Sequence, residues 1–489
     1  MLSITRRVFA GLGALLPLAL VAKEMKDAKD DSTAAETEEV DVLVIGSGAA
    51  GLSAALAAKE AGAKRVLVIE KMPVIGGNTL VSSGVLNAPD PKAQEPLGIK
   101  DSPELFFEQT FEAGRRKANH ELVRVMTEGA LETKLWLQKQ GMVFKEEPFQ
   151  VYGGLWPRSF WPRISHGRGY VAVLSGRCAE EGIPIRTETE AVDFIKTSGG
   201  RVTGVVAQAN SRKLRIEAKS GIVVATGGFT ANAALCASLD PRLEGLSFTG
   251  RPSATGEMLE VARRAGVKLV GMEDIQCNLG PEAGHAYRSG FHLEVTRYVL
   301  VNREGRRFVA EDGERDVIRD AVFAQPGREV FSIVDRDGFQ GMNALFQQSS
   351  IMGKRTKDTF SAESLEELAR QMGVPPGRLL ETIDAFNRSV DEKRDPLGRE
   401  PWMLVNRIER PPFYAARVRM CIHYTMGGIA IDGRARVLDA EGRVMPGFFA
   451  AGEVTGGVHG ANRVGGNGLL GAFVYGRIAG REAAGAGRD

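Results

Sequence analysis

The sequence predicts an α/β fold that begins with two buried parallel strands joined by a glycine-rich loop and a helix. Residues 40–45 (VDVLVI) contain a short apolar run of strand length, and residues 64–70 (KRVLVIE) contain a second one. Between them lie a glycine-rich segment at 46–51 and the alanine-rich residues 52–61, which favour a helix. Glycine accounts for 59 of the 489 residues, and glycine is common where the backbone must approach a ligand closely.

This order of strand, glycine loop, helix, strand and terminal acid is that of a dinucleotide-binding unit. We expect Gly46 to make the tight turn, Gly48 to let the backbone approach a pyrophosphate, and Gly51 to allow close packing of the helix. The start of the helix then faces the phosphates, and Glu70 holds the ribose hydroxyl groups. The unit therefore predicts a Rossmann-like domain.

Further glycine-rich segments favour FAD over a nicotinamide cofactor, because a buried flavin needs contacts along its ribityl chain and ring. Such segments occur at residues 71–84 and at the ends of the apolar strands expected at 222–229 and 447–453. Taken alone, each segment could equally be a turn between strands, but together they predict FAD, bound non-covalently. The residues expected to contact FAD are Gly46, Gly48, Ala50, Gly51, Glu70, Lys71, Gly77, Asn78, Thr79, Ser83, Gly84, Ala225, Thr226, Gly227, Glu257, Gly452, Glu453, Gly468 and Leu469.

Composition and charge exclude several classes of protein. An apolar content of 43% and a charged content of 25% are those of a globular protein rather than a disordered one. The net charge of +2 leaves no basic excess for nucleic acid. The four cysteines contain no CxxC pair, which argues against a structural zinc site and a covalent c-type haem. We therefore expect no metal site.

The first residues have the features of an export signal. The pair Arg6-Arg7 precedes an apolar run at residues 8–22, which is shorter than the ~20 residues of a membrane-spanning helix. We therefore expect residues 1–34 to be a twin-arginine (Tat) signal peptide and linker, which leaves no membrane span after cleavage and places the protein in the periplasm. An uncleaved anchor or a chance arginine pair is the alternative.

Several motifs together resemble the flavoprotein part of soluble fumarate reductases of the flavocytochrome c type. They are IGSGAAGLSAALAA, EKMPVIGGNT, ATGGF, VNREGRRF, HYTMGGIAID and AAGEVTGGVHGANRVGGN. The wider group includes urocanate and acrylate-type reductases and 3-ketosteroid dehydrogenases. The resemblance implies an FAD-binding domain in two segments, 40–274 and 424–489, with an α+β capping domain, 275–423, inserted between them.

The resemblance also implies a chemistry, in which flavin N5 delivers hydride to one alkene carbon and an arginine donates a proton to the other. Arg315 stands at the place of that arginine, ten residues after the glycine of the NREG turn. Arg463 of the GANR motif would bind the substrate carboxylate, although it could instead contact the FAD pyrophosphate. Tyr424 occupies the substrate-contacting position of a histidine pair that this chain keeps only as His423.

The chain departs from the fumarate reductase pattern where the second carboxylate of fumarate would bind. Asn278 replaces a histidine, Gly290 replaces the threonine, and Phe291 and Glu294 replace the relay glutamate and its arginine. We therefore expect Asn278, Gly290 and Phe291 to contact a substrate with only one carboxylate, and the proton relay to be rebuilt. The acids that could return a proton to Arg315 are Glu294, Glu311 and Asp316.

These features predict an exported FAD-dependent reductase of an α,β-unsaturated carboxylate, of the acrylate or arylacrylate type, that serves anaerobic respiration. Since the chain has no CxxCH, its electrons would come from a separate cytochrome c or quinol-oxidising donor. One alternative is a 3-ketosteroid-type dehydrogenase on the same fold, in which Tyr424 polarises a carbonyl. Another is a flavin-carrying electron-transfer subunit that has no substrate of its own.

Overall fold

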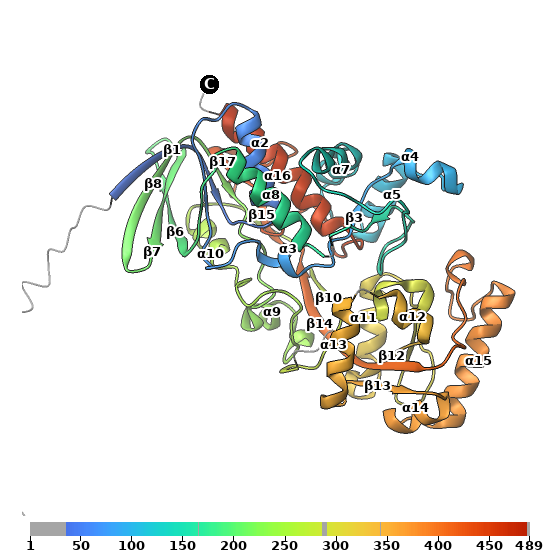
Figure 1. Cartoon of the computed structure of the whole chain (residues 1–489). Helices are drawn as coiled ribbons and strands as arrows, with labels where there is room; N and C mark the ends of the chain where they lie inside the picture. Colours follow the sequence, from blue (N-terminus) through green and yellow to red (C-terminus); the bar gives the residue numbers. More distant parts are fainter. Residues whose placement is uncertain (1–35, 165, 286–290, 343, 487–489) are drawn as a thin grey trace, which may run out of the picture.

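The computed structural model describes residues 36–486 except 165, 286–290 and 343, so the expected signal at 1–34 lies outside the described residues. Two lobes are visible, one built on a large sheet and one on a smaller sheet (Figure 1). The large sheet runs in the order β16-β17-β8-β1-β2-β5, with β6 and β7 continuing from β8. Its strands are β1 (Glu36–Ile45), β2 (Val66–Ile69), β5 (Ile185–Arg186), β6 (Thr189–Lys196), β7 (Val202–Ala209), β8 (Arg212–Val224), β16 (Arg436–Leu438) and β17 (Val444–Ala450).

The centre of the large sheet is parallel, as the two apolar runs predicted. β1 pairs in parallel with β2 on one side and with β8 on the other, and β17 then pairs in parallel with β8. Helices α2 (Ala49–Glu60) and α16 (Asn467–Gly485) pack against this sheet, and α8 (Arg168–Glu180) packs against α2. The chain therefore returns at its end to the domain in which it began.

Glycine allows α16 to lie directly against the backbone of α2. A Cβ at Gly476 would lie 2.4 Å from the carbonyl oxygen of Ala50, and a Cβ at Gly480 would lie 2.1 Å from that of Ala54. No side chain fits at such distances, so both positions require glycine. The two helices consequently pack closely together next to the glycine loop (residues 46–51) that precedes α2.

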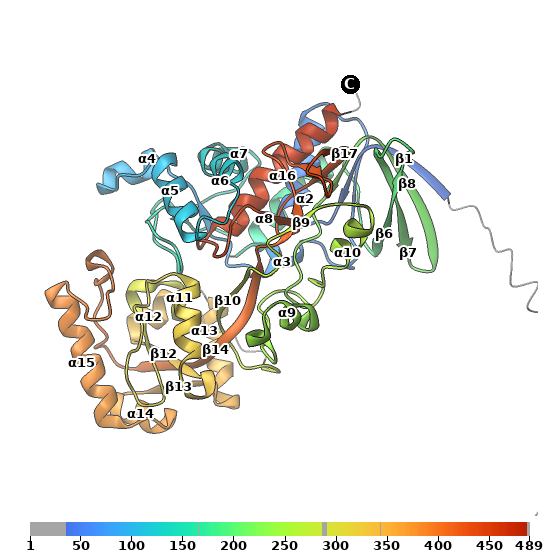
Figure 2. The same cartoon turned by 180° about the vertical axis from the view of Figure 1, so that it is seen from behind.

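The second lobe is built on the sheet β10-β14-β12-β11, with β13 also paired to β14. β14 (Phe413–Thr425) joins the lobes, because its first half pairs with β12 and β13 and its last residues pair with β10. Seen from behind, β14 runs from this lobe up to the large domain (Figure 2). The other elements of the lobe are β10 (Ile275–Gly280), η3 (Phe291–Leu293), β11 (Val299–Val301), α11 (Arg315–Phe323), β12 (Val330–Val334), α12 (Arg336–Gly341), α13 (Ala344–Gly353), β13 (Thr359–Ala362), α14 (Leu365–Met372) and α15 (Pro376–Glu392).

Short elements complete the large domain around the two main layers. These elements are α3 (Gly77–Val81), β3 (Leu86–Asn87), α4 (Pro91–Gln94), α5 (Pro103–Ala113), α6 (His120–Glu128), α7 (Ala130–Lys139), β4 (Ser159–Phe160), α9 (Ala233–Leu239), α10 (Glu257–Arg264), β9 (Leu269–Val270), β15 (Gly428–Ala430) and β18 (Thr455–Gly456). Within the described residues, no helix combines the length and the apolar character that a membrane crossing requires.

A buried ionic cluster centred on Glu311 holds the second lobe together. The carboxylate of Glu311 is fully buried and lies 2.6 Å from guanidinium nitrogens of both Arg307 and Arg399. It also accepts a hydrogen bond from the backbone of Leu300, and Arg307 contacts Asp395 at 2.8 Å. Burial alone would raise the pKa of Glu311, but Arg399 and Arg307 together lower it to about 2. The carboxylate is therefore ionised throughout the physiological range.

Replacing this carboxylate is expected to destabilise the second lobe. Glu311→Gln should lower the unfolding free energy by about 3–5 kcal/mol, because two buried guanidinium groups lose their counter-charge. In the unaltered protein the stabilisation is complete above pH 4.5 and is lost as the pH falls from 4.5 towards 2, since the folded-state pKa is the lower one. Urea unfolding of the FAD-loaded protein between pH 3 and pH 7 measures both effects.

Glu367→Gln on the exposed face of α14 is the matched control, since among the described residues the Glu367 carboxylate contacts only Arg370 and Gln371 at the surface. It should change the unfolding free energy by less than about 0.5 kcal/mol. An equally small change for Glu311→Gln would show that the cluster does not stabilise the lobe.

Candidate active site

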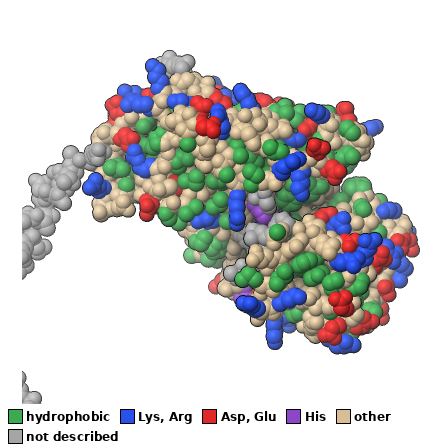
Figure 3. Space-filling view, in the orientation of Figure 1, with side chains coloured by type: hydrophobic (Ala, Val, Ile, Leu, Met, Phe, Trp, Pro, Cys, Tyr) green, Lys and Arg blue, Asp and Glu red, His purple; other side chains and the backbone are tan. Residues whose placement is uncertain are grey.

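A cavity of about 450 Å³ lies at the junction of the two lobes. The space-filling view shows the indentation between the lobes on one face of the molecule (Figure 3). Residues from both lobes line the cavity, including the glycine loop at one end and Arg315 and Arg463 at the other. The expected FAD contacts that line it are Gly46, Gly48, Ala50, Glu70, Lys71, Gly77, Asn78, Thr79, Ser83, Ala225, Thr226, Gly227, Glu257, Gly452, Glu453, Gly468 and Leu469.

The loop at 46–51 opens the start of α2 to this cavity. Gly46 has a φ of +104°, and a Cβ there would lie 2.4 Å from the carbonyl oxygen of Ala225. Gly48 is the N-cap residue of α2 and has no side chain to cap it, while the first N–H of the helix, that of Ala49, donates to Thr79 Oγ1 at 2.9 Å. Exposed backbone N–H groups at a helix N-terminus bind phosphate groups, so the loop fits the pyrophosphate of a dinucleotide. Glu70 lies beside the loop and accepts hydrogen bonds from the backbone and hydroxyl of Ser47.

Two of the expected FAD contacts do not line the cavity. A Cβ at Gly51 would lie 1.8 Å from the carbonyl oxygen of Gly46, so Gly51 allows α2 to pack against the loop. Gly84 has a φ of +83° and packs against the backbone of His166, where a Cβ would be 2.6 Å away. Both glycines shape the site through packing and do not contact the cofactor space directly.

Farther along the cavity lie charged side chains that suit the remaining polar groups of FAD. Each of them is paired with other residues of the protein. Lys71 forms an ion pair with Glu257 where α10 begins. Glu453 accepts hydrogen bonds from the backbone of Thr425 at 3.1 Å and from the side-chain amide of Asn78 at 3.3 Å. Burial raises the pKa of Glu453. These groups continue the polar lining of the cavity from the glycine loop towards Arg315 and Arg463.

Arg315 is the first residue of α11 and is only 6% exposed. It donates hydrogen bonds of 3.0 Å to the side-chain oxygen of Gln276 and to the backbone oxygen of Tyr152, and its Nε has no partner among the described residues. Its side chain packs on Gly153, where a Cβ would lie 2.6 Å from the Arg315 Nε. Burial, together with the nearby charge of Arg463, lowers the pKa of Arg315 to about 9. An arginine in this state gives up a proton far more readily than one in water.

Arg463 lies 5% exposed beside the same part of the cavity. Its guanidinium carbon is 4.3 Å from the centre of the Tyr424 ring, and among the described residues the guanidinium donates one hydrogen bond, to the backbone oxygen of Val464. The Tyr424 hydroxyl lies 3.4 Å from Nε2 of His459. Burial raises the pKa of Tyr424 and lowers that of Arg463. Tyr424 is therefore a neutral hydrogen-bond donor beside a cation.

His292 is a cavity residue that the sequence did not single out. It is 5% exposed, its Nδ1 has no hydrogen-bond partner in the described part of the chain, and its ring meets the Tyr152 ring edge-on at 5.2 Å. Burial and the charge of Arg315 lower the pKa of His292 to about 3, so the imidazole is neutral. Tyr152 and Gly153 were missed as well, although a Tyr-Gly-Gly sequence marks a place where the backbone can approach a neighbour closely.

The structure does not bring every expected site residue to the cavity. Asn278 lines it, whereas Phe291 is buried against Phe339 in the second lobe, and His292 and Leu293 line the cavity in its place. Glu294 points to solvent, with its side chain 49% exposed and paired with Arg297, which does not fit the expected catalytic role. Gly290 lies outside the described residues.

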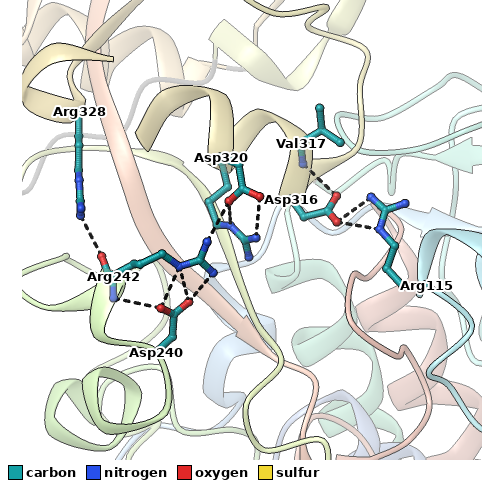
Figure 4. A network of polar contacts seen from close by, with 8 residues as sticks. Arg115, Asp240, Arg242, Asp316, Val317, Asp320 and Arg328 are labelled. Carbon is teal, nitrogen blue, oxygen red and sulfur yellow. Dashed lines mark hydrogen bonds and ion pairs between the residues drawn. The ribbon is translucent and has the colours of Figure 1, made fainter. Parts of the chain in front are cut away.

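The other two acids expected to return a proton to Arg315 are engaged elsewhere. Glu311 belongs to the buried cluster with Arg307 and Arg399, and Asp316 pairs with Arg115. Among the described residues, neither forms a hydrogen bond or ion pair with Arg315. The close view shows Arg115 and Arg242 reaching α11 at Asp316 and Asp320 (Figure 4).

A dinucleotide loop and a pair of buried arginines in one cavity, on a two-lobed α/β fold, define a flavin-dependent oxidoreductase. The sequence matches the family described as FAD binding domain over residues 41–469, and the chain belongs to this family. FAD is its cofactor. The fold class and the family resemblance expected from the sequence are both confirmed.

Relatives of known activity cover most of the chain. It is 35% identical to a fumarate reductase (cytochrome) of Shewanella frigidimarina, over 96% of this chain and 81% of the relative. It is 29% identical to the acrylate reductase flavoprotein subunit of Shewanella woodyi, over 97% of both chains. The solved open conformation of a flavocytochrome c3 fumarate reductase superposes with a TM-score of 0.71 at 30% identity, over 96% of this chain and 81% of that one.

The glycine loop gives a direct test of cofactor binding. Gly48→Val should abolish retention of FAD, because the side chain would occupy the space of the pyrophosphate. The fold should survive, since a Cβ at this position would come no closer to protein than 3.5 Å, from Thr79 Oγ1. Flavin absorbance of the purified protein, and the nucleotide released on denaturation, measure the effect.

Gly176→Ala on α8 is the control, because a Cβ there would have no atom within 4 Å. The control should retain FAD, which denaturation should release intact. Release of FMN or NAD, or normal flavin content in Gly48→Val, would contradict the assignment of the loop.

Proposed function

We propose that this protein is an exported FAD-dependent reductase of an α,β-unsaturated carboxylic acid with a single carboxylate, of the acrylate or arylacrylate type. The names of its relatives support reduction of a carbon–carbon double bond beside a carboxylate. The proposal rests on one observation above all, namely the two buried arginines at one end of the cavity.

Arg315 and Arg463 are both buried in the cavity, and among the described residues neither guanidinium forms an ion pair with a carboxylate, although the charge of Glu453 acts on Arg463. Among the described residues, the hydrogen-bond acceptors of both guanidinium groups are neutral, and the Nε atom of each has no partner. Burying an unpaired cation is costly, which is why the pKa of both arginines is lowered. An anionic ligand would supply the missing charge, and a carboxylate matches the planar guanidinium fork.

The residues divide the reaction between them. Bound FAD, once reduced, supplies a hydride from N5. Arg463 binds the substrate carboxylate, Tyr424 donates a neutral hydrogen bond to it, and the positive charge of Arg463 stabilises negative charge that develops on this group. Arg315, held by Gln276 and the Tyr152 carbonyl, donates the proton to the second alkene carbon. The buried setting excludes water from both groups.

The rest of the cavity favours a substrate with one carboxylate. Apart from Arg315 and Arg463, the only Lys or Arg among the described lining residues is Lys71, which pairs with Glu257. His292 is neutral, and Asn278 uses its side-chain oxygen to accept from the backbone of Leu279. The apolar side chains of Leu293, Phe346 and Phe248, which also line the cavity, suit an alkyl or aryl substituent.

The two rival functions fit this site less well. A neutral steroid ketone would leave both arginines without a counter-charge, even if Tyr424 polarised its carbonyl. An electron-transfer subunit without a substrate would have no use for a buried anion site. The presence of both arginines therefore favours the proposal that the protein reduces a carboxylic acid.

Export and the electron donor belong to the proposal as well. Arg6-Arg7 and the apolar run at 8–22 support Tat-dependent transport to the periplasm. The sequence has no CxxCH for haem, and NADH is absent from the periplasm, so a separate cytochrome c or quinol-oxidising protein would reduce the flavin. In this setting the reaction would serve anaerobic respiration.

Arg315→Ala should retain FAD and its reduction by dithionite while turnover of the substrate falls by at least about 10²-fold, the usual contribution of general acid catalysis. Arg315→Lys should behave similarly, because an ammonium group cannot make both hydrogen bonds of the guanidinium. Oxidation of reduced methyl viologen by the substrate measures turnover. Near-normal turnover in Arg315→Ala would remove this arginine from the reaction.

A panel of acceptors tests the substrate class. Reduced methyl viologen is oxidised in parallel with fumarate, acrylate, methacrylate, cinnamate, urocanate and a 3-ketosteroid. A monocarboxylate should be best, and fumarate should be about 10²–10³-fold less efficient, because burying a second carboxylate without a cation costs several kcal/mol. Fumarate as the best substrate would overturn the single-carboxylate assignment, and the ketosteroid as the best would overturn the anion site.

A further inference from the structure

Arg115 joins the large domain to the helix that carries Arg315. It follows α5, has a φ of +56°, and its guanidinium contacts Asp316 Oδ2 through two nitrogens, at 2.7 and 3.0 Å. The same guanidinium lies 3.0 Å from Glu314 Oε2. Figure 4 shows Arg115 reaching Asp316 at the start of α11. One cation of the large domain thus pairs with the residues on both sides of Arg315.

A chain of hydrogen bonds connects this ionic contact to the catalytic guanidinium. Glu314 accepts a hydrogen bond of 3.0 Å from the side-chain amide of Asn462, the residue before Arg463. The oxygen of Asn462 accepts one of 2.9 Å from Gln276, whose own oxygen accepts from Arg315. Gln276 also donates to the backbone oxygen of Arg463 at 2.8 Å. Both arginines of the site are therefore tied to Glu314.

The two flanking carboxylates point away from the guanidinium that they neighbour in sequence. Glu314 is the N-cap residue of α11, yet its side chain caps no backbone N–H, because it is turned to Arg115 and Asn462. The charge of Arg463 acts on Arg315, whereas among the described residues neither Glu314 nor Asp316 forms a hydrogen bond or ion pair with the Arg315 guanidinium. The unpaired state of Arg315 therefore depends on where these carboxylates are held.

We propose that Arg115 is a positioning residue of the active site, which binds Glu314 and Asp316 and thereby keeps Arg315 in place and free of a carboxylate partner. This inference rests on the proposed role of Arg315 as proton donor. Without Arg115, the first turn of α11 loses its ionic contact with the large domain and keeps hydrogen bonds such as that from Asn462 to Glu314, and the two acids beside Arg315 lose their cation. The guanidinium would then move from its contacts with Gln276 and Tyr152.

The pair is partly exposed to solvent, with the Arg115 side chain at 41%, so it contributes little to stability. Its loss should be seen in the rate of reaction and not in folding. Carboxylate binding should change little, because that task belongs to Arg463. These expectations separate a positioning role from a merely structural one.

The experiment compares Arg115→Ala, Arg115→Lys, Asp316→Asn and the double variant Arg115→Ala/Asp316→Asn as FAD-loaded enzymes. The control is Arg116→Ala, because Arg116 lies in the same turn with a φ of +54° and, within the part of the chain that the structure describes, pairs only with Glu112 of α5. Turnover is measured with reduced methyl viologen and the best acceptor of the panel above. Thermal unfolding and flavin content are recorded for each variant.

Arg115→Ala should lower kcat by about tenfold and change KM by less than about twofold, because a small displacement of Arg315 affects the proton transfer and not binding. Arg115→Lys should recover part of the loss, and the double variant should be no slower than Arg115→Ala. High salt should slow the unaltered enzyme but not Arg115→Ala. Arg116→Ala should resemble the unaltered enzyme throughout.

Normal kcat in Arg115→Ala, alongside an inactive Arg315→Ala, would overturn this inference and leave the proposed function standing. Normal turnover in Arg315→Ala would instead overturn the proposed proton donor. Equal losses in Arg115→Ala and Arg116→Ala, or a loss accompanied by lower flavin content or stability, would show a structural effect of the turn and also refute the positioning role.

Discussion

The site depends on backbone contacts that only glycine permits. Gly51 lets the start of α2 touch the carbonyl of Gly46, and Gly476 and Gly480 let the last helix of the chain lie against the backbone of α2. These contacts bring the two ends of the chain together around one loop. The exposed N–H groups at the start of α2 and the glycine-rich segment that follows β17 consequently form one continuous surface for FAD. The same small residues explain the high glycine content of the sequence.

At the other end of the cavity, around Arg315 and Arg463, the charges of the side chains determine which ligand fits. Among the described residues both guanidinium groups donate only to neutral acceptors, and burial lowers the pKa of both, although the charge of Glu453 opposes this shift at Arg463. Gly153 makes room for Arg315, and Gly468 lies against Arg463 and Tyr424, where a Cβ would be 3.1 Å from the Tyr424 ring. The acids of the region are held elsewhere, Glu311 by two arginines of its own lobe and Glu314 and Asp316 by Arg115. The free arginines are thus a result of how the neighbouring carboxylates are paired.

The junction between the lobes is the point at which these two ends meet. β14 carries Tyr424 from the second sheet into the large domain, and Gln276 of β10 is its partner in the ladder. α11 places Arg315 against Gly153 of the large domain, while Arg115 and Arg242 contact the acids of α11 from the opposite side. A displacement of one lobe against the other would therefore separate Arg315 from Arg463. The site is therefore complete only when the two lobes are packed against each other.

The sequence by itself determined the parts of the protein that depend on local spacing. The dinucleotide loop, its flanking strands and Glu70 follow from residues 40–70, since the turn and the helix start are set by consecutive residues. The GANR and NREG motifs identified Arg463 and Arg315, although the absence of a carboxylate partner for either was not visible in them. Only the tertiary structure decided which side chain of η3 faces the cavity. In a single turn of 3₁₀-helix a shift of one residue changes the direction of a side chain, and packing decides the outcome: Phe291 is buried against Phe339, His292 lies against Tyr152, and Glu294 turns to solvent with Arg297. Those contacts join segments far apart in the chain, so spacing within 290–294 could not reveal them.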